Sequence, residues 1–268
     1  APSFTAPSPD GPVTLVVGVP ATVELVATGS PVPTVTVEGT LPAGLTIVGD
    51  GTGSLTITGT PTQHGTFPLT ARATNAHGTG SRPVYLTIGR RPTFGADTLA
   101  LSAETGRGFM TRLDLAAFPP ATLAVTDGAL PPGVLLTPDG SLHASPTAPG
   151  RYEATVTATN EHGVDTMTVV IDVWTRPDLA YPSGRLSFST AAETAVSATF
   201  RTVGWPAPSV TLSPGWTLPP GLSLRVDPDD PYARRLVGEV ARADAGQYWS
   251  RFVVANGVGP DRTVDVSM

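Results

Sequence analysis

Apolar and polar residues alternate in short runs along this chain, and Gly, Pro or Asn bounds each run. Seven such runs occupy the first third: Val13–Val17, Thr22–Ala27, Thr34–Glu38, Leu45–Val48, Ser54–Thr58, Thr66–Thr74 and Val84–Ile88. A period of two is typical of a strand with one buried face. No stretch carries a helical period of 3.6. Seven short strands in about 90 residues predict a two-sheet β-sandwich.

The chain repeats its phrases three times. LPAGL at 41–45 recurs as LPPGV at 130–134 and LPPGL at 218–222. HGTFPLTARATNAHG at 64–78 recurs at 149–163 and 245–259, and the spacing from its Gly to its Asn is constant. Fixed spacing locates a strand and its corner, whereas variable spacing locates loops. We therefore expect three all-β domains of about seven strands each, at 1–89, 90–175 and 176–268.

The fixed-spacing strand predicts which side chains enter each core. Alternation places Phe67, Tyr152 and Tyr248 on the inner face, followed two residues later by Leu69, Ala154 and Ser250. In unit 3 it places Phe252 and Val254 inside and Trp249 outside.

The third copy contains DAGQYWS at 244–250, which resembles the D-x-G-x-Y-x-C phrase of immunoglobulin-type domains. Ser250 stands where that phrase has its Cys, and the chain has no Cys, so no disulfide forms. A disulfide contributes about 2–4 kcal/mol, and burying one Leu about 1.5–3 kcal/mol, so packing can replace it. We expect unit 3 to depend more on Phe252 and Val254.

Two short motifs predict local geometry. A Tyr two residues before the Cys position can hydrogen-bond backbone across its corner, which Tyr152 and Tyr248 can do and Phe67 cannot. In LPxG the Gly occupies the turn position that needs a positive φ, so Gly→Ala should cost on the order of 1 kcal/mol. The three turn glycines are Gly44, Gly133 and Gly221.

These phrases together resemble the bacterial putative-immunoglobulin repeat family of the He-PIG type. Unit 1 carries LPAGL, GTPTQHGTF (59–67) and ARATNAHG (71–78), and unit 2 carries LPPGV, SPTAPGRY (145–152) and VTATNEHG (156–163). Unit 3 is closer to the sequence pattern of intermediate-set immunoglobulin domains, with GWPAPSV at 204–210 and DAGQY. The resemblance implies tandem immunoglobulin-like modules on secreted or surface proteins of bacteria, beside enzymes or adhesin tips, or on phage virions.

Charge and hydropathy exclude two classes of partner. Charged residues are 14% of the chain, the formal net charge is −6, and no basic patch is present, so we expect no nucleic-acid binding. Apolar runs are too short to insert into a membrane. Ala1 in place of an initiator Met favours a processed or excised segment, whose partners would be neighbouring domains of a longer chain or assembly.

Catalytic and metal-binding patterns are weak. No G-x-S-x-G elbow or recurring Ser/His/Asp set is present, so we expect no enzyme activity. His77 and His162 occupy equivalent Asn-x-His-Gly turns, where a turn role outweighs metal binding. Asp227, Asp229 and Asp230 form the strongest candidate Ca²⁺ cluster, with a solvated loop as the alternative. We expect no other metal and no cofactor.

Four aromatic residues of unit 3 are candidates for binding a glycan or a protein: Trp205, Trp216, Tyr232 and Trp249. The alternative is contact between domains. We expect a non-catalytic spacer array on an extracellular or cell-surface protein, which supports adhesion or display. Short linkers, RRP at 90–92 and TRP at 175–177, would limit bending. The rival interpretations are a binding module in unit 3 and a protein of the phage virion surface.

Overall fold

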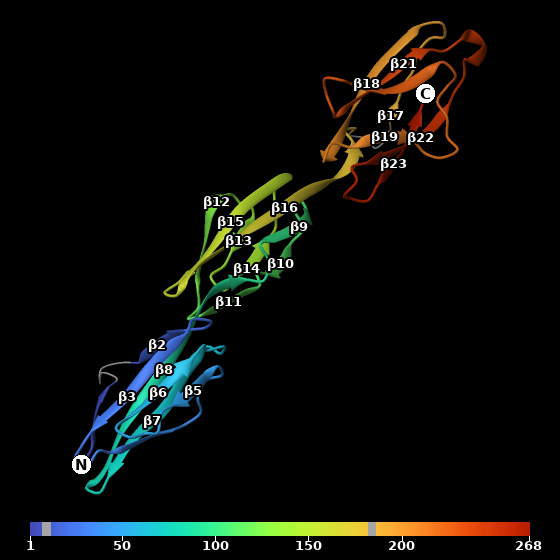
Figure 1. The fold of residues 1–268 in the computed structure, drawn as a ribbon. Helices are drawn as coiled ribbons and strands as arrows, with labels where there is room; N and C mark the ends of the chain where they lie inside the picture. The colour runs from blue at the N-terminus through green and yellow to red at the C-terminus, as the bar shows by residue number, and fades with distance from the viewer. Residues whose placement is uncertain (7–11, 182–185) are drawn as a thin grey trace.

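The computed structural model describes residues 1–6, 12–181 and 186–268. It shows three β-sandwiches in a row, with the N-terminus and the C-terminus at opposite ends (Figure 1). Each sandwich has its own cluster of buried apolar residues. The predicted all-β class, with sandwiches of two sheets, is confirmed.

All seven strands predicted for the first sandwich are present. They are β2 (Val13–Val16), β3 (Ala21–Thr28), β4 (Thr34–Glu38), β5 (Leu45–Val48), β6 (Ser54–Gly59), β7 (Gly65–Asn75) and β8 (Gly78–Phe94). A further strand, β1 (Ser3–Ala6), pairs with β3 and was not predicted. One sheet has the order β1-β3-β6-β5, and the other contains β8-β7-β4 with β2 parallel to β8.

The second sandwich repeats this plan. Its strands are β9 (Thr98–Glu104), β10 (Phe109–Arg112), β11 (Leu115–Phe118), β12 (Thr122–Gly128), β13 (Val134–Leu136), β14 (Ser141–Ala144), β15 (Gly150–Asn160) and β16 (Gly163–Leu179). One sheet is β10-β14-β13, and the other contains β12-β15-β16 with β9 parallel to β16. The parallel strands β2 and β9 thus take the same place in their sandwiches.

The third sandwich contains β17 (Leu186–Ser187), β18 (Ala195–Trp205), β19 (Ser209–Leu212), β20 (Leu222–Val226), β21 (Ala233–Glu239), the 3₁₀ turn η1 (Arg242–Asp244), β22 (Trp249–Ala255) and β23 (Arg262–Ser267). The order β17-β23-β22-β19 forms one sheet, and β18-β21-β20 lie in the other. Within the described residues the parallel strand β17 covers two residues, whereas β9 has seven.

The predicted linkers are strands instead. RRP lies inside β8 and TRP inside β16, each of which is 17 residues long. The end of β8 pairs with β11 of the second sandwich, and the end of β16 pairs with β18 of the third. Prolines are tolerated because the partner strand bonds to their neighbours, with register shifts at both pairings. The boundaries proposed after 89 and 175 fall inside these two crossing strands.

The fixed-spacing motif forms the central strand of each core. Leu69, Ala154 and Ser250 are at most 2% exposed. In the third sandwich Phe252 is fully buried, and its ring stacks on Phe200 with centroids 5.8 Å apart. Alternation alone therefore oriented this strand, because a shift of one residue would place every apolar side chain in solvent.

Candidate functional site

The crossing strands are fastened by the asparagine of the fixed-spacing motif. The Asn160 side-chain amide donates to the carbonyls of Arg90, at 2.9 Å, and Pro119, at 3.0 Å. The Asn256 amide donates to Thr175, at 2.8 Å, and Trp205, at 3.1 Å. Arg90 and Thr175 belong to β8 and β16, so each asparagine bonds the entering strand to the end of a strand of the next sandwich, directly after β11 at Pro119 and at the last residue of β18 at Trp205. The constant Gly-to-Asn spacing was the available signal, but its interdomain role was missed.

An ion pair reinforces the second junction. Arg176 of β16 lies 2.6 Å from Glu104 of β9 through its Nε, and Arg107 also contacts this carboxylate. The hydrogen bond from Arg176 holds the pKa of Glu104 below its usual value of 4.5. It also raises the pKa of Arg176. The residue at the position of Glu104 in the first sandwich is Val16, as the parallel pairings show, so this ion pair belongs to the second junction.

The corner residues differ as their hydroxyl groups dictate. The Tyr248 hydroxyl donates to the carbonyl of Asp244 at 2.8 Å, and that of Tyr152 to Ala148 at 3.3 Å. Phe67, which has no hydroxyl, packs against the core of the first sandwich. The corners therefore hold the loop before the central strand and present no free polar group.

The three turn glycines share one geometry. Gly44, Gly133 and Gly221 have φ of 89°, 85° and 89°. Each turn closes with a hydrogen bond from the residue after the glycine to the carbonyl three residues earlier. A Cβ on any of them would also overlap a backbone carbonyl of the neighbouring segment, at Thr60, Ser145 or Glu239 respectively. The glycine is required for space as well as for φ.

Ser250 bonds to the backbone from inside the third core. Its hydroxyl donates to the carbonyl of Thr217 at 2.7 Å, and the residue is fully buried. A buried hydroxyl without a partner would be costly, so this bond makes serine tolerable at the Cys position.

Two of the four candidate aromatics gather on the outer face of the third sandwich. The Arg251 guanidinium lies over the Trp216 ring, 5.0 Å from its centroid, and pairs with Asp265 at 2.6 Å. That pair raises the pKa of Arg251. Trp249 is 50% exposed and precedes Arg251 by two residues on β22, so both point outward. We call Trp216, Trp249, Arg251 and Asp265 the aromatic face.

The other two candidates lie elsewhere. Trp205 is half-buried at the second junction, where it pairs with Thr175. Tyr232 is half-buried in the loop between β20 and β21, and its backbone bonds to Asp230 and Thr202. Sequence reasoning did not single out Arg251, although its spacing of two residues from Trp249 was a usable signal.

Two aspartates of the acidic loop, Asp227 and Asp230, have separate partners. Asp227 accepts a hydrogen bond from the backbone of Asp229, and Asp230 pairs with Arg201. Among the residues that the structure describes, no group of three His, Cys, Asp or Glu side chains could hold a metal ion. The loop therefore offers Ca²⁺ no set of three side-chain ligands.

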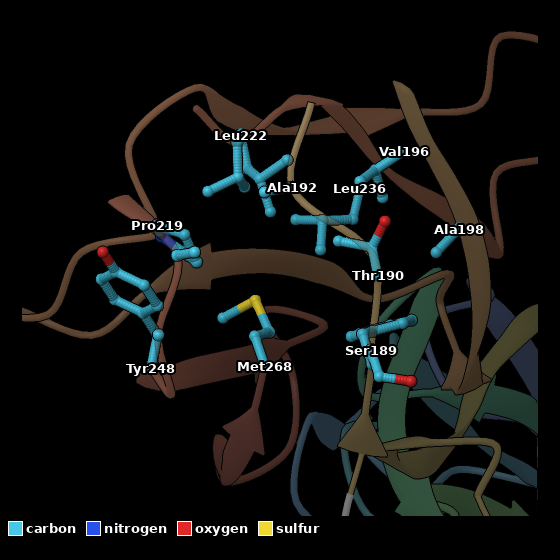
Figure 2. A pocket seen from close by; sticks show the side chains of 14 residues that line it. Ser189, Thr190, Ala192, Val196, Ala198, Pro219, Leu222, Leu236, Tyr248 and Met268 are labelled. Carbon is cyan, nitrogen blue, oxygen red and sulfur yellow. The ribbon is translucent and has the colours of Figure 1, made fainter. Parts of the chain in front are cut away.

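An apolar pocket of about 220 Å³ lies in the third sandwich. Val196, Leu222, Leu236 and Met268 surround it, with Tyr248 at one end (Figure 2). The loop at Ser189–Ala192 lines it where the short β17 has ended. The described residues that line the pocket include the hydroxyls of Ser189, Thr190 and Tyr248 but no His, Asp, Glu or Lys, so no lining hydroxyl has a side-chain base beside it within the pocket.

Comparison with protein families confirms the resemblance for the first of the three units. The family model described as "Putative Ig domain" (He_PIG) matches residues 2–89, which contain β1 to β7 and most of β8. A search of curated proteins found no match. Within the described residues, no helix has the length and hydrophobicity of a membrane span.

Solved structures show the same fold across all three sandwiches. The I-band fragment I67-I69 from titin matches with a TM-score of 0.56 and 15% identity, covering 99% of this chain and 97% of that chain. The structure of Dpr2 Ig1-Ig2 in complex with DIP-Theta Ig1-Ig3 matches with a TM-score of 0.50 and 14% identity, covering 99% and 98%. An endo-fucoidan hydrolase matches with 20% identity over 96% of this chain and 42% of its own, but its TM-score of 0.32 carries no argument about catalysis.

Proposed function

Starting from three immunoglobulin-like sandwiches in series, we propose that this protein is a non-catalytic spacer array on a bacterial surface or secreted protein. Its role is mechanical, namely to hold an adhesive or displayed domain away from the envelope. The observation that supports it most is that β8 and β16 each cross a junction as one strand. At about 3.3 Å per residue, the 17 residues of either strand reach about 56 Å.

The spacer proposal requires an extended particle with limited bending. Small-angle X-ray scattering of the whole chain should give a maximum dimension on the order of 100 Å, because three sandwiches lie end to end. The scattering curve should fit one elongated shape. A compact particle, or a curve that needs a broad ensemble of bent shapes, would refute the proposal.

The aromatic face supports a second candidate function, the binding of a glycan or a protein partner. Sugar rings stack on exposed tryptophan, and an arginine fixed by Asp265 offers directed donors beside it. Specific binding of the whole chain on a glycan array should then be lost in Trp216→Ala and Trp249→Ala. Tyr85→Ala is the matched control, since Tyr85 is also 50% exposed but lies in the first sandwich. If the parent binds no glycan, or if all three variants lose binding equally, the binding function is rejected and only the spacer function remains.

A further inference from the structure

At the first junction, the His162 side chain occupies the space that a side chain on Gly89 would need. Gly89 is buried in β8, and His162 lies at the turn between β15 and β16. A Cβ on Gly89 would fall within the imidazole ring of His162. The His162 side chain is only 7% exposed. The φ of Gly89 is outside the left-handed region, so glycine is needed there for space alone.

The second junction also pairs a large residue with a glycine, but here the large residue is on the crossing strand and the glycine is in the turn, one position after the one that corresponds to His162. Trp174 takes the place on β16 that Gly89 takes on β8, because its carbonyl accepts from Thr105 as that of Gly89 accepts from Val17. Here the glycine is Gly259, in the turn between β22 and β23. A Cβ on Gly259 would lie 2.7 Å from the Trp174 ring. Both turns point back toward the preceding sandwich (Figure 1).

We propose that these two large-and-small pairs, His162 with Gly89 and Trp174 with Gly259, are steric keys that fix the orientation of neighbouring sandwiches and encode their order. The turn of the third sandwich placed after the first would leave empty the space that the Trp174 ring fills beside Gly259, because Gly89 has no side chain. The turn of the second placed after another second would drive His162 into Trp174. Each turn therefore fits only the crossing strand that precedes it in this chain.

Independent contacts across each junction hold the keys in place. At the first, the His64 ring of the first sandwich stacks on Phe118 of the second, with centroids 5.2 Å apart. At the second, Arg176 pairs with Glu104. These contacts and the asparagine bonds limit sliding, so an overlap at Gly89 cannot be relieved by a small shift.

The absence of cysteine allows a direct test in the whole chain. Spin labels on Thr46→Cys, in the first sandwich, and Ala124→Cys, in the second, report the distance between exposed positions. The parent should give one narrow distance distribution. Gly89→Ala should broaden or shift it, because the methyl group displaces the imidazole. Gly89→Ala/His162→Ala should return it toward the parent, because the overlap is gone.

Controls separate a key from a general weakening of the fold. In Gly108→Ala the new methyl meets its nearest atom at 3.6 Å and φ is also outside the left-handed region, so the distribution should stay narrow. Circular dichroism and a thermal melt check that each variant is folded. If Gly89→Ala unfolds the first sandwich, recovery of folding in the double variant still supports the key.

Three results would overturn the proposal: a broad distribution in the parent, a Gly89→Ala distribution equal to that of Gly108→Ala, or no recovery in the double variant. The keys and the spacer role are separable. If the particle is extended but the label distances do not depend on Gly89, the spacer function stands and the steric keys are rejected. If the label distances depend on Gly89 but the particle is compact, the steric keys stand and the spacer function is rejected.

Discussion

At several positions in this protein, nearby backbone groups restrict which amino acid fits as strongly as the local backbone conformation does. Gly133 has a positive φ, but the carbonyl of Ser145 also occupies the space that a Cβ would need. Ser250 is buried where alternation requires an inner residue, and its hydroxyl is satisfied by Thr217. In both cases the sequence identified the position, and the packed neighbour set the energetic consequence.

Gly133→Ala should destabilise the second sandwich by more than the about 1–2 kcal/mol that a left-handed conformation costs. Gly106 is the matched control in the same sandwich, with φ of 77° and no heavy atom within 4 Å of its Cβ position. Gly106→Ala should therefore show the conformational cost alone. Chemical denaturation followed by circular dichroism measures both, and equal losses would contradict the role of the Ser145 carbonyl.

Ser250→Ala should lower the stability of the third sandwich by about 0.5–1.5 kcal/mol, because it removes a buried hydrogen bond. Ser209→Ala removes a similar bond, to the carbonyl of Ala255 at 3.1 Å, at an exposed position where water can replace the hydroxyl. The thermal midpoint should fall more in Ser250→Ala than in Ser209→Ala. The reverse order would show that the Ser250 bond does not matter.

At the scale of the element, side-chain hydrogen bonds stabilise a hairpin turn. The turn between β13 and β14 contains Asp139, whose carboxylate accepts hydrogen bonds from the hydroxyls of Thr137 and Ser141 and from the Ser141 backbone. These bonds, Thr137 first, lower the pKa of Asp139 from 3.8 to about 2. Because the folded pKa is depressed, the stabilisation is complete above pH 4 and is lost as the pH falls toward 2.

The effect of these hydrogen bonds should be visible in the pKa of Asp139. Thr137→Val should raise the pKa of Asp139 toward 3.8, measured by NMR of the side-chain carboxyl carbon. Asp139→Asn should also flatten the loss of thermal stability between pH 4 and pH 2. Persistence of a pKa near 2 in Thr137→Val would show that the Thr137 hydroxyl is not its cause.

At the scale of the whole molecule, the junctions are part of the sheets. The crossing strands, their asparagine bonds and the Arg176–Glu104 pair bind each sandwich to the next. Neighbouring sandwiches should therefore tumble as one unit rather than reorient independently of each other. Glu104 has a lowered pKa, so its contribution is present above its usual value of 4.5 and is lost as the pH falls through the folded pKa.

Acidification should consequently loosen the second junction. Spin labels on exposed positions of the second and third sandwiches should report a broader distance distribution at low pH. Arg176→Gln should show that breadth at neutral pH and little further change on acidification. If parent and variant respond alike, then the ion pair does not contribute to the orientation.

The sequence predicted local features well and the junctions badly. Seven strands of the first sandwich, the inner face of the central strand and the family of residues 2–89 followed from alternation and repeated phrases. The RRP and TRP segments were interpreted as linkers because they lie where one repeat ends and the next begins. Whether a proline lies in a strand depends on the partner strand, which here belongs to the next sandwich.

By itself the sequence determined the all-β class, the three copies, the absence of a crosslink and the buried side of the central strand in each copy. These are consequences of period, spacing and residue type, which local chemistry sets. Only the tertiary structure decided that Trp216 and Arg251 meet, that Asn160 bonds across a junction and that His162 sits on Gly89. Those contacts join residues far apart in the chain, and their geometry follows from packing that no local pattern encodes.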